Sequence, residues 1–152
     1  MRCGWILYFL AGLLLMSCAG PEALRVKTFV LRDDERSMGS NPWARMEKES
    51  RLRGAVTMEE RRQRLGQYFT VLWSDGDIGG GEVEVVFEYV QGKTGSRVKK
   101  RTEKFAASQS RGRASFAVIG DDYVGNGRVL AWQVRLLRGG SEIASRRSYL
   151  WR

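Results

Sequence analysis

From residue 67 to the end of the chain, apolar and polar side chains alternate along short segments that glycine-containing turns separate. In "GEVEVVFEYVQ", for example, every second residue from position 83 is apolar, while glutamates occupy the other side. A period of two is the signature of a strand with one buried face. The pattern predicts that the core contains Phe69, Val71, Trp73, Val83, Val85, Phe87, Tyr89, Ala114, Phe116, Val118, Leu130, Trp132, Val134 and Leu136.

Two more segments extend this pattern toward the ends of the chain. Residues 25–32, "RVKTFVLR", alternate enough to form a first strand, and the turn at 138–141 leads into a last strand, "EIASRRSYLWR". We therefore expect an all-β antiparallel β-sandwich of about seven strands, which resembles immunoglobulin-like or fibronectin type III-like domains. A small antiparallel barrel would show the same pattern.

One or two short helices are expected near the N-terminal side of this sandwich. Asn41 followed by Pro42 is typical of a helix start and precedes "WARMEKESR". Thr57 and Glu60 have the spacing of a capping box, in which each side chain bonds the other residue's backbone, at the start of "MEERRQRLG".

The first 17 residues have the features of an export signal. Arg2 is their only charge, and the apolar run from Trp5 to Met16 would span about 18 Å as a helix, well short of the ~30 Å hydrocarbon core. The run ends at Leu15-Met16-Ser17-Cys18, which resembles the lipobox of bacterial lipoproteins. The resemblance implies cleavage between Ser17 and Cys18 and lipidation of the Cys18 sulfur.

This resemblance sets the predicted organisation of the chain: a signal peptide at 1–17, a lipidated tether at 18–24 and a single domain at 25–152. Ala19 is not the aspartate that retains lipoproteins at the inner membrane, so an outer-membrane location facing the periplasm is implied. Ordinary secretion with cleavage after Ala19, and an uncleaved anchor, are the alternatives.

Missing residue types exclude several chemistries. The chain has no histidine, and its two cysteines, Cys3 and Cys18, both precede the domain. Ser-His-Asp and Cys-His nucleophiles, His/Cys zinc sites and haem ligation through histidine are therefore excluded. We predict no catalytic residue, metal or cofactor.

The candidate carboxylates of the domain occur beside turn-forming residues, where Asp usually bonds its own backbone. They form three groups: Asp33-Asp34-Glu35, Asp75 and Asp77 with Glu82, and Asp121-Asp122. We interpret all three as turns, although calcium binding by the second group remains an alternative. The segment "GDIGGGE" at 76–82 lacks the Lys-Ser/Thr of a phosphate loop and precedes a strand, so we predict a hairpin loop there.

The chain carries 26 Lys and Arg against 17 Asp and Glu, a net charge of +9, which favours anionic partners. The basic run at 97–104 is expected to be neutralised within a sheet, with Glu88 opposite Lys99, so nucleic acid is not a predicted partner. The less compensated cations are predicted to contact anionic lipid or cell-wall polymer: Arg111, Arg113, Arg146 and Arg147.

These observations predict a cell-envelope lipoprotein that acts as a non-catalytic binding module. A structural or assembly factor for an envelope protein complex is the alternative, and a hydrolase that uses carboxylates is the least favoured. Trp73 and Trp132 are expected to fill the core, in preference to stacking on sugars at the surface.

Overall fold

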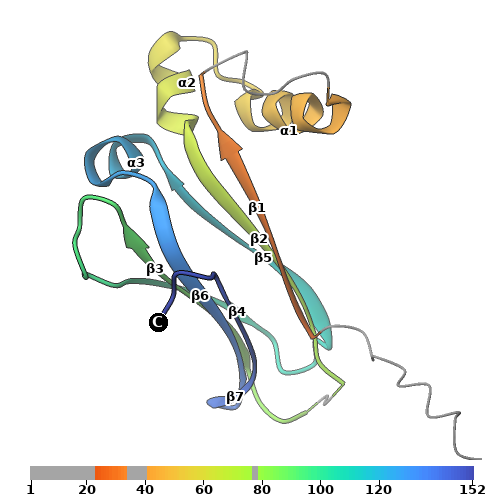
Figure 1. The fold of residues 1–152 in the computed structure, drawn as a ribbon. Coiled ribbons are helices and arrows are strands. Elements are labelled where there is room, and N and C mark those ends of the chain that lie inside the picture. The colour runs from red at the N-terminus through yellow and green to blue at the C-terminus, as the bar shows by residue number, and fades with distance from the viewer. Residues whose placement is uncertain (1–22, 34–40, 77–78) are drawn as a thin grey trace, which may run out of the picture.

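Two antiparallel sheets form a sandwich in the computed structural model, which describes residues 23–33, 41–76 and 79–152 (Figure 1). The three-stranded sheet has the order β1-β2-β5, and the four-stranded sheet has the order β4-β3-β6-β7. The strands are β1 (Leu24–Leu31), β2 (Gly66–Ser74), β3 (Val83–Gln91), β4 (Lys99–Phe105), β5 (Arg111–Ile119), β6 (Val129–Arg138) and β7 (Ser141–Arg147). The predicted sandwich of seven strands is confirmed, and its two separate sheets exclude the barrel.

The strand order also shows how the chain crosses between the sheets. The fourth strand, β4, pairs with β3 in the sheet that does not contain β1, whereas a constant-type immunoglobulin domain has its fourth strand in the same sheet as its first. The segment 76–82 joins β2 of one sheet to β3 of the other. The prediction of a hairpin loop there was therefore wrong, because its two flanking strands do not pair.

The core consists of the inward-facing side chains of both sheets, as the alternation predicted. Phe87 lies at its centre, with its ring centroid 4.7 Å from that of Phe69 and 5.1 Å from that of Phe116. Leu130 is the exception, since its side chain is 39% exposed. A register shift between Val90 and Gln91 leaves Leu130 without a partner, and Val129 takes the inward position instead.

Both predicted helices are present, with the expected caps. The Asn41 side chain accepts a hydrogen bond from the Trp43 backbone amide at the start of α1 (Pro42–Leu52). Thr57 and Glu60 form the reciprocal capping box of α2 (Met58–Arg64), and backbone hydrogen bonds from Thr57 and Val56 lower the pKa of Glu60.

A third helix, α3 (Gly120–Asn126), was not predicted, because Asp121-Asp122 was interpreted as a turn. In the chain it lies between β5 and β6, far from the N-terminal segment where the helices were expected, but in the fold it contacts α2. Tertiary contacts hold its first residue: Gly120 donates to the Leu65 carbonyl at 2.9 Å, and a Cβ at Gly120 would lie 2.3 Å from the Gln63 side chain. The local sequence pattern does not indicate such tertiary contacts, so the helix could not be predicted from it.

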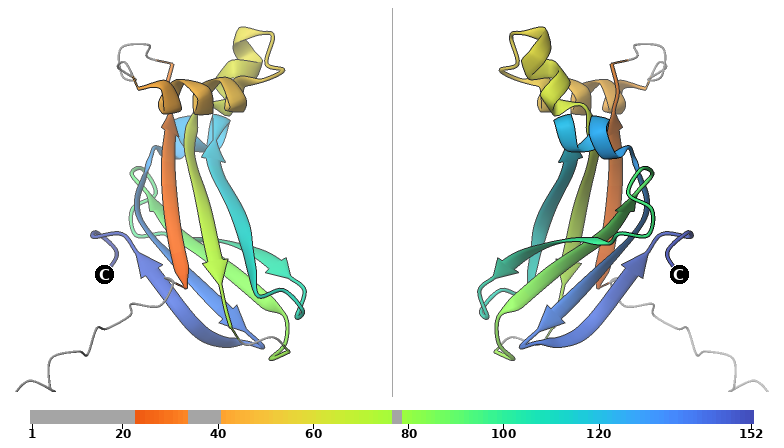
Figure 2. Two further views of the ribbon diagram at one scale, coloured as in Figure 1. Left: turned by 90° about the vertical axis from the view of Figure 1, so that its right-hand side faces the viewer. Right: turned by 90° about the vertical axis from the view of Figure 1, so that its left-hand side faces the viewer.

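Figures 1 and 2 show α1 and α2 at the end of the sandwich opposite the start of β1, with α1 crossing the outer face of the three-stranded sheet. The first strand begins one residue earlier than predicted, since Leu24 is buried and pairs with Trp73. Ser17, Cys18 and the predicted signal peptide lie outside the described residues. Within the described part of the chain, no helix is long and apolar enough to cross a membrane.

Candidate anion-binding site

Four cations lie on the outer face of the three-stranded sheet. Because Val71 and Ala114 face the core, the alternate positions of β1 and β5 face outward: Arg25, Lys27, Arg111 and Arg113. We call these four residues the basic face. None of the three strands contains an Asp or Glu. Strand spacing places the two basic rows about 10 Å apart, on either side of β2.

Three of the four cations of the basic face keep an uncompensated charge. Lys27, Arg111 and Arg113 form no ion pair with any residue that the structure describes. Gly112 fixes the outward direction of its two arginine neighbours, because it faces the core and a Cβ there would lie 2.7 Å from the Trp73 ring.

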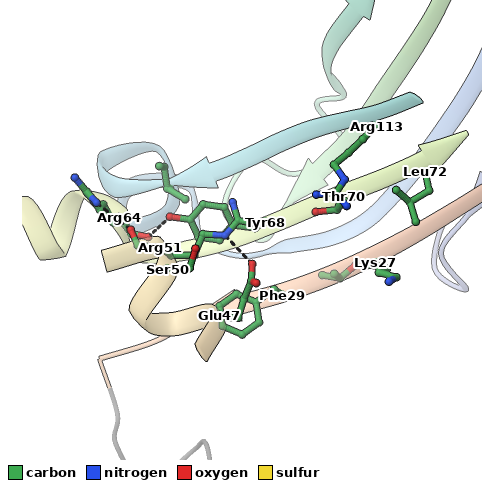
Figure 3. A pocket seen from close by; sticks show the side chains of 12 residues that line it. Lys27, Phe29, Glu47, Ser50, Arg51, Arg64, Tyr68, Thr70, Leu72 and Arg113 are labelled. Carbon is green, nitrogen blue, oxygen red and sulfur yellow. Dashed lines mark hydrogen bonds and ion pairs between the residues drawn. The ribbon is translucent and has the colours of Figure 1, made fainter. Parts of the chain in front are cut away.

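A groove of about 750 Å³ runs between this face and α1 (Figure 3). Its floor comes from the sheet and its wall from the helices. Figure 3 shows Lys27, Thr70, Leu72 and Arg113 at one end and the residues of α1 with Tyr68 at the other. The sheet contributes Lys27, Phe29, Tyr68, Thr70 and Arg113 to the lining, and the helices contribute Glu47, Ser50, Arg51 and Arg64.

Polar contacts fix the helical wall against the sheet. Arg64 donates to the backbone carbonyl of Arg51 at 3.0 Å, and the Tyr68 hydroxyl donates to the carbonyl of Arg64 at 2.6 Å. The Arg51 guanidinium lies 4.3 Å from the centroid of the Tyr68 ring. Burial raises the pKa of Tyr68 against the opposing effect of Arg51 and Arg64, which keeps the phenol protonated as a donor.

The groove has an excess of positive charge. Of the lining residues that the structure describes, four are cationic and Glu47 is the one carboxylate. That carboxylate is bonded by Arg51, with 2.8 Å between Arg51 Nε and Glu47 Oε1. Lys27, Arg64 and Arg113 therefore remain without a carboxylate partner among the described residues.

The outer face of the four-stranded sheet has a different charge pattern. Lys104 lies 2.8 Å from Glu82 and 3.0 Å from Glu84, and the hydrogen bonds that it donates to these glutamates raise its pKa. Arg135 lies 3.2 Å from Glu88 and 3.8 Å from Glu142. These pairs neutralise cations that would otherwise attract an anionic partner.

The basic run at 97–104 was predicted to be neutralised within the sheet, with Glu88 opposite Lys99. The predicted position of Glu88 was wrong by one residue. Glu88 lies opposite Lys100, and it bonds Arg135 on the neighbouring strand. Lys99 instead lies 2.6 Å from Asp122 of α3. The unpredicted helix therefore supplies the partner of Lys99.

The structure separates the four cations that the sequence had grouped. Arg111 and Arg113 belong to the basic face, whereas Arg146 and Arg147 are on β7 of the other sheet. Arg146 and Arg147 are consecutive in a strand, so they point to opposite sides. Sequence reasoning missed Arg25 and Lys27, although "RVKTFVLR" shows two cations at alternate positions without an acid.

The described carboxylates of the candidate calcium group, Asp75 and Glu82, have structural partners. Asp75 forms an ion pair with Arg138, which is 4% exposed and also donates to the carbonyls of Gly81, Ala107 and Gln109. Glu82 is bonded by Lys104, while Asp34, Glu35 and Asp77 lie outside the described residues. Among described residues, no group of three His, Cys, Asp or Glu side chains could hold a metal ion.

The two tryptophans that were predicted in the core both pack there, though to different extents. Trp73 is 3% exposed, and its ring centroid lies 5.1 Å from that of Phe105. Trp132 is partly buried and meets Phe69 edge to face at 6.1 Å.

Comparisons with known proteins identify no relative of this chain. No protein-family model, no curated protein and no solved structure matches the chain. Its function is therefore inferred from its own residues and geometry.

Proposed function

We propose that this chain is a cell-envelope lipoprotein, anchored through Cys18 in the outer membrane, whose basic face binds an anionic membrane surface. Binding is the whole of the proposed activity, and no reaction is assigned. The lipobox resemblance supports the anchor, and the geometry of the sheet supports the surface contact.

The observation that carries the proposal is the position of the four cations. Leu24 of β1 lies opposite Trp73, which lies opposite Gly112 of β5, so β1 and β5 begin at the same end of the sheet. Arg25 and Lys27 fall within the first four residues of β1, and Arg111 and Arg113 within the first three of β5. The basic face therefore occupies the half of the sheet that the tether enters.

A short tether would keep this half close to the membrane. Residues 19–23 separate Cys18 from β1 and reach at most about 18 Å when fully extended. That distance is about two Debye lengths at physiological salt, within which anionic headgroups attract cations. Each Lys or Arg near such a surface contributes about 1 kcal/mol.

The positions of the carboxylates support a binding role over hydrolysis. A glycosidase-type reaction needs two carboxyl groups facing one cleft. The groove contains Glu47 alone, and Arg51 bonds it. Asp75 and Asp122, from two of the other candidate groups, are ion-paired outside the groove.

A role in assembling an envelope complex is a second candidate, favoured by exposed apolar side chains on α1. Trp43 is 77% exposed and Met46 is 60% exposed, and their spacing of three residues places them on one side of the helix. Such a pair is suited to contact a partner protein. Crosslinking in the native cells, with Trp43→Ala and Met46→Ala as controls, would recover that partner.

Cosedimentation with vesicles tests the main proposal. The chain from residue 19 is suitable, because the described core cluster begins at Leu24 and is therefore retained. We expect it to sediment with anionic vesicles at low salt, to be released at high salt, and to stay in solution with neutral vesicles. Equal recovery in the supernatant under all conditions would contradict the proposal.

A further inference from the structure

We propose that the groove beneath α1 is a binding site for a phosphate group carried on a polyol, with the phosphate between Lys27 and Arg113 and the polyol beneath α1. The inference rests on the proposed function, since it names the chemistry that the basic face would recognise. Glycerol phosphate is the simplest ligand of this class, and it occurs both free and as the headgroup of anionic lipids.

The phosphate end is defined by two cations that lie on opposite sides of β2. Lys27 is paired with Thr70 in the sheet, and Arg113 is paired with Leu72, the next outward-facing residue of β2. Both cations line the groove and have no ion-pair partner among the described residues. The arginine fork and the lysine ammonium are the side-chain donors best suited to phosphate oxygens.

From these cations toward α1, the groove offers hydroxyl groups and ring surface. Ser50 lies on the helical wall and Thr70 on the floor, and neither side chain makes a hydrogen bond to a residue that the structure describes. Phe29 and Tyr68 lie along the same floor. Free hydroxyls beside aromatic surface suit the alternating polar and apolar groups of a polyol.

The site is formed before any ligand binds. Thr70 is on the central strand β2, which is hydrogen-bonded to β1 on one side and to β5 on the other. The contacts of Arg64 and Tyr68 hold the C-terminal end of α1 over this floor. The ligand would therefore enter a fixed recess, which lowers the entropic cost of binding.

A chemical-shift titration of the isotope-labelled chain from residue 19 tests the proposal. The probes are glycerol phosphate, inorganic phosphate and neutral glycerol. Glycerol phosphate should shift the backbone amides of residues 27, 50, 70 and 113, inorganic phosphate should shift those of 27 and 113 more weakly, and glycerol should shift none. Competition by free glycerol phosphate against phosphatidylglycerol vesicles should show that both sources use one site.

Three variants make the test specific. Thr70→Tyr fills the groove and keeps every charge, and Lys27→Gln with Arg113→Gln removes the two cations. Each should weaken glycerol phosphate binding at least about tenfold, Thr70→Tyr because it occupies the recess and the charge variant because it removes charge-assisted hydrogen bonds to the phosphate. Lys100→Gln with Arg147→Gln, a matched lysine and arginine pair on the other sheet, should change binding less than about twofold.

Two results would overturn the site: binding that Thr70→Tyr leaves unchanged, or equal losses in the two charge variants. If anionic vesicles still sediment the chain while glycerol phosphate shifts no groove amide, the groove inference fails and the proposed function stands. Absence of vesicle binding together with a specific glycerol phosphate site would overturn the proposed function alone.

Discussion

The two outer faces of the sandwich carry the same number of cations but very different net charge. The four-stranded sheet presents Lys100, Lys104, Arg135 and Arg147 together with four glutamates, Glu82, Glu84, Glu88 and Glu142. The three-stranded sheet presents the four cations of the basic face, and its strands contain no carboxylate. The placement of acids therefore decides which face can bind an anion.

This difference separates charges that stabilise the fold from charges that remain for a partner. Arg135 and Glu88 have side chains that are 29% and 20% exposed, so their contact is partly shielded from solvent. Lys27 and Arg113 are exposed and gain nothing from the fold. Self-repulsion among such cations costs stability, and binding an anion removes that cost.

The largest expected effect is the loss of membrane attachment when the proposed lipid anchor is removed. Any remaining attraction to the membrane then comes from the two outer faces of the sandwich. Cys18→Ser should abolish lipid incorporation and shift nearly all of the protein from the membrane to the soluble fraction at high salt. The reason is that acyl chains contribute about 0.8 kcal/mol per buried CH₂. Cell fractionation measures the shift, and a variant that stays membrane-bound and uncleaved would contradict the lipoprotein assignment.

The next largest effect is expected on stability, at Gly112, which faces the core between Arg111 and Arg113. Gly112→Ala should lower the free energy of unfolding by about 1–3 kcal/mol, because the added methyl meets the Trp73 ring in a packed core. Urea unfolding measures the change. Gly125→Ala is the control, since nothing lies within 4 Å of a Cβ at that position. Equal stability of the two variants would contradict the described packing of β5.

Removing one cation from each face compares their structural roles directly. Arg135→Ala should cost about 1 kcal/mol of unfolding free energy, because it leaves Glu88 without its two hydrogen bonds from Arg135. Arg113→Ala should change stability by less than about 0.5 kcal/mol. Urea unfolding at one pH suffices, and a larger loss for Arg113→Ala would contradict the assignment of the two faces.

A smaller effect is expected from acid, through the carboxylate that neutralises Lys99. Burial raises the pKa of Asp122, but hydrogen bonds from Lys99 and Asn126 outweigh it and hold the pKa below the ordinary value of 3.8. The stability that Asp122 contributes is therefore present above about pH 4 and is lost as the pH falls through the lower folded-state pKa.

Asp122→Asn should remove this contribution, about 0.5 kcal/mol, at pH 6 and have little effect at pH 2. Urea unfolding of both proteins at these two pH values measures it. An equal difference between the two proteins at both pH values would show that the charge of Asp122 plays no part.

The strands could be predicted from sequence, because apolar and polar residues that alternate with a period of two indicate directly which side chains are buried. That signal failed at Leu130, where an extra residue in β6 breaks the alternation without any mark in the sequence. It also failed at α3, whose first residue is held by contacts with α2. Both failures come from tertiary context, which overrides local pattern.

Only half of the candidate site could be predicted. Arg111, Arg113, Arg146 and Arg147 were grouped only because their charge is little compensated in the sequence, and two of the four belong to the basic face. The partners Arg25 and Lys27 lie more than 80 residues earlier in the chain, and they join the site only because β1 and β5 both pair with β2. The groove was not predictable, since it depends on where α1 crosses the sheet.

The most direct test of the account compares matched charge removal on the two faces, measured as binding of the chain from residue 19 to anionic vesicles at low salt. Lys27→Gln with Arg113→Gln and Lys100→Gln with Arg147→Gln lower the net charge equally. At about 1 kcal/mol per cation, the first variant should bind about 30-fold more weakly, and the second should stay within about threefold of the unaltered chain. Equal losses in both variants would contradict the account, because they would mean that net charge alone, and not the basic face, binds the membrane.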